Sequence, residues 1–221
     1  MTPPSVIEID TAYAIGGNVV KDYWNLSNQN IILEILVEGD STLFDGKIQP
    51  LIQFDSGGYD NIGEEHTINY GDSLKLLDIS RSLITQMEEY REGRNISFKY
   101  TIWDKAGNVS ESLTDNTLFH IDEIIPIVEL DTLYSDNELS ANWATVSDSI
   151  FISYISNEGL FNPTSILFLD TIINNNSDRG RFWSSKTIVD TTDPNGEVNF
   201  YFSFSDTAGN ISDAIIDNSL S

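Results

Sequence analysis

The sequence predicts an all-β protein made of two similar units joined by a short acidic connector. Three observations predict this architecture. A motif in the middle of the chain returns near its end, apolar residues alternate with polar ones along short segments, and turn-forming residues separate those segments. Alternation at every second position places apolar side chains on one face of a strand. Several short strands with polar turns between them are typical of a sandwich or barrel.

The repeat is clearest around two aspartates. Residues 96–110 read ISFKYTIWDKAGNVS, and residues 198–212 read VNFYFSFSDTAGNIS. The alternating apolar positions are Ile96, Phe98, Tyr100 and Ile102 in the first copy, and Val198, Phe200, Phe202 and Phe204 in the second. In the Asp-x-Ala-Gly-Asn stretch that follows, Gly and Asn tolerate positive φ, and Asp can accept hydrogen bonds from nearby amides. We therefore expect a strand, a sharp turn and a returning strand in each copy.

The beginnings of the two copies also match. Val6–Thr11 resembles Ile127–Thr132, and Trp24 corresponds to Trp143. The beginnings lie further apart than the ends, so the first copy carries extra residues, which we place mostly between Asp55 and Arg94. Pro126 ends the acidic connector that starts at Asp122, and a proline belongs before a strand or at its edge. We expect domain 1 to span 1–122 and domain 2 to span 123–221.

Further strands and one helix are expected within the two copies. The other strand candidates are Val6–Ile9, Ile31–Val37, Ile48–Phe54, Ile127–Leu130, Ile150–Ile155 and Ile166–Leu169. From Ser80 to Arg94 the apolar residues Leu83, Ile84, Met87 and Tyr90 have helical spacing. This pattern predicts a short helix in an inserted loop of the first domain, which either caps one end of the sandwich or carries a binding function.

Composition excludes several classes of function. The chain has 35 Asp+Glu against 11 Lys+Arg, a net charge of −24, so it repels the phosphates of nucleic acids and of anionic lipids. The absence of cysteine excludes disulfides, thiolate zinc sites and cysteine nucleophiles. It also favours a bacterial origin, because secreted eukaryotic β-sandwich domains often carry a disulfide. Apolar runs are too short for a membrane helix, and Met1–Ser5 lacks a secretory signal. We expect the chain to be an excerpt of a longer protein, and we expect that it does not insert directly into a membrane.

The Asp-x-Ala-Gly-Asn turns at Asp104–Ser110 and Asp206–Ser212, with the connector Asp122–Pro126, resemble the immunoglobulin-like repeats of large bacterial surface adhesins and multidomain secreted proteins. The resemblance covers the last third of each copy well and the start of each copy fairly. It implies two tandem immunoglobulin-like β-sandwich domains. It also implies a spacer, stalk or adhesive segment outside the cell or on its surface, next to further repeats, with a cell-surface or glycan ligand.

A calcium site at the inter-domain joint is one interpretation of the acidic residues there. Asp104 and Asp206 end equivalent strands, and Asp122 and Glu123 lie in the connector. Ca²⁺ takes six to eight oxygen ligands, which such carboxylates supply; some families of the kind named above bind Ca²⁺ at their joints. The alternative is that Asp104 and Asp206 only cap their turns through hydrogen bonds to the backbone.

An enzymatic function is not expected. His66 and His120 lie in no metal or nucleophile motif, and paired carboxylates are common in so acidic a chain. The alternative to the spacer is an accessory ligand- or carbohydrate-binding module of a secreted enzyme. Sugar rings stack on exposed tryptophans, and Trp183, expected in a loop beside Arg181 and Phe182, is the candidate ligand residue.

Overall fold

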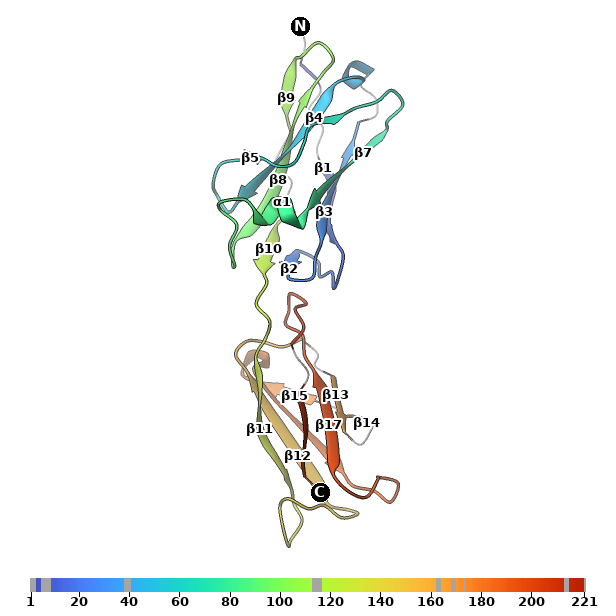
Figure 1. The fold of residues 1–221 in the computed structure, drawn as a ribbon, viewed down its shortest axis with the longest axis vertical. Helices are drawn as coiled ribbons and strands as arrows, with labels where there is room; N and C mark the ends of the chain where they lie inside the picture. The colour runs from blue at the N-terminus through green and yellow to red at the C-terminus, as the bar shows by residue number, and fades with distance from the viewer. Residues whose placement is uncertain are drawn as a thin grey trace. The chain divides into compact units, whose positions relative to one another are not determined.

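A computed structural model describes residues 3–4, 9–37, 41–112, 117–161, 164–167, 170–172, 174–212 and 215–220, with backbone only for 164–178, 198–199 and 215–220. The chain divides into two compact units, Met1–Glu123 and Ile124–Ser221 (Figure 1). Within the described residues, secondary structure is mostly strand, which confirms the all-β prediction. No helix in this part of the chain is long and apolar enough to cross a bilayer.

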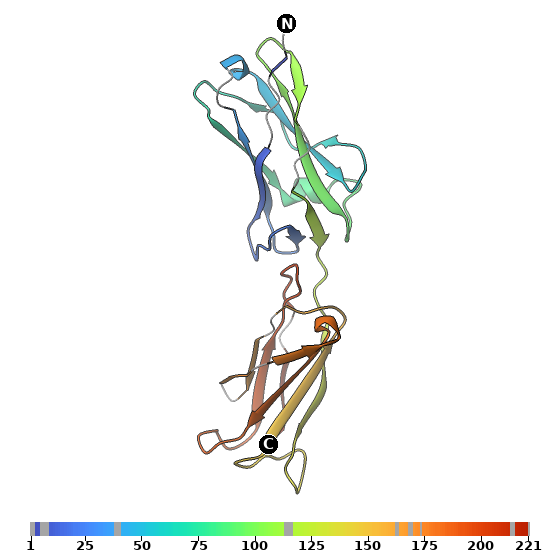
Figure 2. The ribbon, with the colours of Figure 1, turned by 180° about the vertical axis from the view of Figure 1, so that it is seen from behind.

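The N-terminal unit consists of two sheets. The first has the strand order β1 (Ile9–Ile15), β3 (Asn30–Leu36) and β7 (Leu74–Ser80), all antiparallel. The second has the order β2 (Tyr23–Asn25), β10 (Phe119–Asp122), β8 (Asn95–Trp103), β4 (Lys47–Phe54) and β5 (Asp60–Asn61); β6 (His66–Thr67) also pairs with β4, and β9 (Val109–Glu111) with β8. Figure 2 shows the two sheets from behind.

The core of the N-terminal unit lies between these sheets. Leu33 and Ile35 of β3, with Phe98 and Tyr100 of β8, are fully buried in one cluster. Their positions alternate along each strand, as the period-two pattern predicts. Trp24 of β2 is also fully buried in this cluster, so both sheets contribute to one core.

The sequence predicts a short helix within Ser80–Arg94, and the structure has one at the start of this stretch. α1 spans Arg81–Thr85, and the chain continues from Gln86 in turns. Ile84 is buried, and Leu83, Met87 and Tyr90 pack against the same core. The helical spacing of these residues therefore reflects that all four side chains contact one core. Turns at Met87 and Tyr90 bring them there without a continuous helix. A 3₁₀ helix, η1 (Ser41–Leu43), precedes β4.

The C-terminal unit also has two sheets. One has the order β11 (Val128–Ser135), β12 (Ser149–Ser156), β16 (Phe182–Ile188) and β15 (Asn174–Ser177). The other has the order β14 (Asp170–Ile172), β13 (Thr164–Leu167), β17 (Val198–Ser203) and β18 (Ile215–Leu220), and η2 (Asp178–Gly180) precedes β16. Tyr154 of β12 packs against Phe202 and Phe204, with ring centroids 5.2 and 4.9 Å away. This unit thus has an aromatic core of its own.

Candidate functional site

The acidic turn of the N-terminal unit follows β8 directly. Asp104 Oδ1 accepts a hydrogen bond from the Asn108 backbone N–H at 2.8 Å, and Asp104 Oδ2 accepts one from Asn108 Nδ2 at 2.6 Å. The Asp104 N–H donates to Asn108 O at 3.0 Å. Gly107 lies between them with φ +84°, a conformation that side chains with a Cβ rarely adopt. The Asp104 carboxylate therefore stabilises the turn by accepting hydrogen bonds from Asn108 at its other end.

The C-terminal unit repeats this geometry. Asp206 Oδ1 accepts from the Asn210 N–H at 2.9 Å, and Oδ2 accepts from Asn210 Nδ2 at 2.8 Å. The Asp206 N–H donates to Asn210 O at 3.1 Å, and Gly209 has φ +91°. Asp206 and Asn210 are both 2% exposed. Both aspartates thus make the turn-capping hydrogen bonds that one of the two sequence interpretations expects.

The hydrogen bonds of the first turn affect ionisation. The side chain of Asn108, together with backbone N–H groups of the turn, lowers the pKa of Asp104, although desolvation opposes this. A carboxylate whose pKa is lower in the folded state stabilises that state fully above its unfolded pKa. The contribution is lost as the pH falls through the folded pKa, so acid weakens this turn.

The predicted calcium ligands have different surroundings. Among the described residues, Asp104 belongs to no group of three metal-ligating side chains. Asp206, within the C-terminal unit, has a carboxylate oxygen within 4.8 Å of one of Glu158. Two carboxylates supply at most four of the six to eight oxygens that Ca²⁺ takes. Glu158, which the sequence did not suggest, is thus a further candidate calcium ligand beside Asp206.

The two acidic residues of the predicted connector belong to the end of the N-terminal unit. Asp122 is the last residue of β10 and pairs with Asn25 of β2. Glu123 forms an ion pair with Arg81 of α1, and its backbone N–H donates to Glu92 Oε2 at 2.8 Å. The charge of Glu123 is therefore already balanced by a guanidinium, so this residue is a poorer calcium ligand than the sequence suggests.

Arg81 is a residue whose structural role the sequence did not reveal. Its guanidinium donates to the backbone oxygens of Asn25 and Asn28 at 2.9 and 2.8 Å, and it lies 5.2 Å from the ring centroid of Trp24. These partners lie far from Arg81 in sequence, so no local pattern could identify them. Arg81 joins α1, the loop after β2 and the end of β10.

Trp183 is not the exposed loop residue that the sequence predicts. It lies on β16, is 5% exposed and belongs to the core of the C-terminal unit. Its Nε1–H donates to Gly180 O at 2.6 Å. This burial leaves no ring face on which a sugar could stack. Trp143, which sequence comparison made equivalent to the buried Trp24, is instead 59% exposed.

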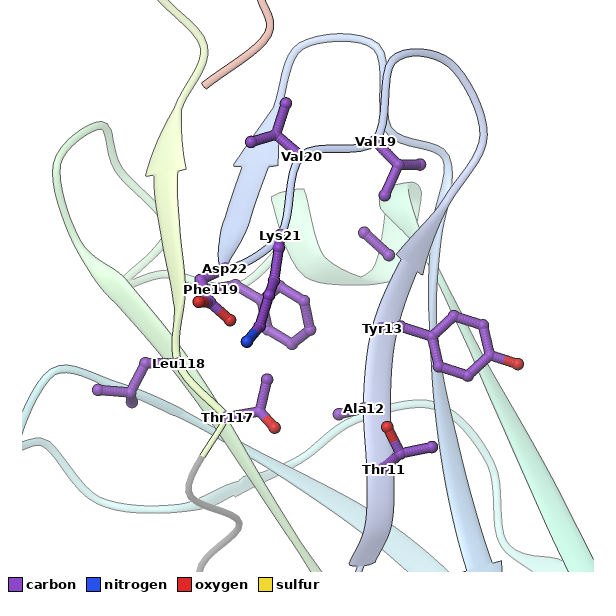
Figure 3. A pocket seen from close by; sticks show the side chains of 11 residues that line it. Thr11, Ala12, Tyr13, Val19, Val20, Lys21, Asp22, Thr117, Leu118 and Phe119 are labelled. Atoms are coloured by element: carbon purple, nitrogen blue, oxygen red, sulfur yellow. The ribbon is translucent and has the colours of Figure 1, made fainter. Parts of the chain in front are cut away.

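A groove in the N-terminal unit is a further candidate site that sequence reasoning missed. It lies between β1 and the segment leading into β10, with the loop 19–22 at one end (Figure 3). The walls come from opposite ends of the unit's sequence, so only the fold brings them together.

A scan of protein-family models found no match to this chain, and a search of the curated proteins found none either.

Proposed function

We propose that the chain is a pair of tandem immunoglobulin-like modules acting as a non-enzymatic spacer, stalk or adhesive segment of a larger extracellular bacterial protein. The observation that carries this proposal is the strand order of the C-terminal unit. Labelled A to G along the chain with an additional C′, its strands run A-B-E-D in one sheet and C′-C-F-G in the other. Sheets ABED and CFG define the immunoglobulin sandwich.

The N-terminal unit supports the same assignment. Its first sheet, β1-β3-β7, corresponds to strands A, B and E, and β10-β8-β4-β5 corresponds to G, F, C and C′. The capped acidic turn follows strand F in both units. A repeated fold needs the same turn in each unit, and tandem repetition of self-contained units is typical of spacers.

The connector also supports a spacer. Glu123 is tied to the N-terminal unit by Arg81 and Glu92. Within the C-terminal unit, the Ile127 N–H donates to Asn157 Oδ1 at 2.8 Å, and the Asn157 N–H donates to Ile127 O at 3.1 Å. Residues 124–126 alone separate these anchored positions, and a short connector transmits tension without adding slack.

Pulling on the two ends of the full chain is expected to give two separate unfolding events, because each unit has its own core. At 3.3–3.6 Å per extended residue, the contour gains are about 420 Å for Met1–Glu123 and about 330 Å for Ile124–Ser221, less the folded lengths. Optical tweezers with handles at both termini measure these gains. A single event with the combined gain, or extension without resistance, would contradict the spacer proposal.

The full sequence of the gene that encodes this chain would discriminate between the two proposed functions, the spacer and the accessory binding module. Further copies of Asp-x-Ala-Gly-Asn in the same reading frame would support a repeat array. An adjoining hydrolase domain, without further copies, would instead favour the accessory binding module and count against the spacer.

The sequence predicted calcium at Asp104, Asp122, Glu123 and Asp206, and this prediction can be tested at Asp206, which the structure places near Glu158. An ion that binds only the folded state raises its melting temperature. We expect millimolar Ca²⁺ to raise the transition of the C-terminal unit in calorimetry of the full chain, and Glu158→Gln to remove that shift. Asp104→Ala, in the other unit, is the control and should retain it. An unchanged transition with Ca²⁺, or a shift that survives Glu158→Gln, would exclude this site.

A further inference from the structure

The groove of the N-terminal unit separates one strand of each sheet. Thr11–Ala14 of β1 form one wall and Thr117–Phe119 the other, and Val19–Asp22 close one end (Figure 3). The cavity measures about 860 Å³. Val19 and Leu118 on its rim are 50% and 51% exposed. The groove is thus open, and its lining combines apolar side chains with the charged residues Lys21 and Asp22.

The backbone alternation shows which part of β1 faces the groove. In an antiparallel ladder, successive residues direct their amide groups to opposite neighbours. The Val37 N–H bonds to Ser73 O at 2.9 Å, so odd-numbered residues of β3 face β7. Ile32 then faces β1, where its partner is Tyr13. The amide groups of Tyr13 therefore pair with β3, and those of Ala12 point into the groove.

In the described part of the chain, β1 ends its sheet, so this edge has no neighbouring strand. The equivalent edge of the C-terminal unit differs. There β11, the counterpart of β1, lies against β18, the last strand of the other sheet. The corresponding seam of the N-terminal unit is where the groove opens. An unpaired edge of this kind is a template for an added strand.

Lys21 and Asp22 are the charged residues that line the groove, and no ion pair joins these two described side chains. The Lys21 ammonium points into the cavity between the two walls (Figure 3). It makes no ion pair with any described residue, although acidic groups outnumber basic ones threefold in this chain. A cation directed into a groove complements a carboxylate on whatever occupies it.

We propose that this groove binds an extended peptide segment of a partner protein, which adds to β1 as a strand and places an Asp or Glu side chain against Lys21. Main-chain hydrogen bonds to Ala12 and Ala14 would hold the strand, and the apolar rim would select alternate side chains. The inference does not depend on the spacer function.

The test pans a displayed library of random short peptides on the full chain, with counter-selection on Ala12→Pro. Proline removes the N–H that faces the groove and leaves the ladder with β3 intact, since edge strands tolerate it on the open side. We expect enriched peptides with alternating apolar residues and one acidic residue. Calorimetric titration with the synthetic peptides should show about tenfold weaker binding to Lys21→Ala, the loss of one charged hydrogen bond.

Matched controls separate strand addition from other binding. Lys21→Arg keeps the charge and should bind the peptides more tightly than Lys21→Ala does. Lys105→Ala removes an exposed lysine outside the groove and should bind them as the parent chain does. Peptides N-methylated at alternate residues should not bind, and they serve as the test if Ala12→Pro fails to fold. The proposal is overturned if nothing is enriched, or if binding is indifferent to Lys21→Ala and N-methylation. A concentration-dependent dimer abolished by Ala12→Pro would overturn it in favour of a second copy.

Discussion

Trp24→Ala is expected to destabilise the N-terminal unit by about 4 kcal/mol, the usual cost of removing a large buried aromatic side chain. The indole of Trp24 is fully buried, and its Nε1–H donates to Tyr90 Oη at 3.2 Å. The guanidinium of Arg81 lies over its ring. The substitution leaves a cavity, removes the partner of the Tyr90 hydroxyl and uncovers Arg81. The cost therefore exceeds that of lost apolar area alone.

Denaturant unfolding of the full chain, followed by hydrogen exchange and mass spectrometry, measures this effect unit by unit. Peptides from Met1–Glu123 should lose protection at lower denaturant, and peptides from Ile124–Ser221 should not change. Trp143→Ala is the matched control, because Trp143 is 59% exposed and surface changes usually stay within about 0.5 kcal/mol. Equal destabilisation by the two substitutions, or a loss in both units, would contradict this account of the core.

Asp206→Ala should destabilise the C-terminal unit by about 2–3 kcal/mol, the range for a hydrogen-bonded charged group. The substitution removes the two carboxylate oxygens that accept hydrogen bonds from the N–H and Nδ2 of Asn210, a residue that is 2% exposed. Asp206→Asn keeps one acceptor for the backbone N–H, so we expect a smaller loss. The same exchange experiment measures both variants.

Glu129→Ala is the control for the acidic turn, because it removes one negative charge from an exposed position on β11. It should leave the C-terminal unit within about 0.5 kcal/mol of the parent. Asp104→Ala should weaken the N-terminal unit in the same way as Asp206→Ala weakens the C-terminal one. Because the pKa of Asp104 is lowered, its removal should also make the stability of that unit less sensitive to acid. Unaltered stability in both aspartate variants would disprove the capping role.

Local patterns predicted the elements that depend on local chemistry. Alternation at Ile96–Ile102 predicted β8, because those side chains enter one core. The Asp-x-Ala-Gly-Asn stretch predicted a turn, because positive φ and a capping carboxylate act within a few residues. Pro126 was expected before a strand, and β11 begins at Val128.

The remaining features depend on partners that are distant in sequence. Trp183 begins a stretch rich in serine, yet pairing with Tyr154 on β12 places it in the core. Residues 174–177 read NNNS, which has no alternation of apolar residues, yet they form β15 by pairing with β16. Arg81 contacts Asn25, which is far from it in sequence. The groove is lined by residues from the two ends of the N-terminal unit's sequence. No periodicity within a single segment contains that information.

The burial of one indole in each unit has a practical consequence. Trp24 lies in the first core and Trp183 in the second, whereas Trp143 is on the surface. A buried indole fluoresces at shorter wavelength than a hydrated one. A chain that retains only Trp24 or only Trp183, with phenylalanine at the other tryptophan positions, therefore carries an intrinsic optical reporter of whether that one unit is folded.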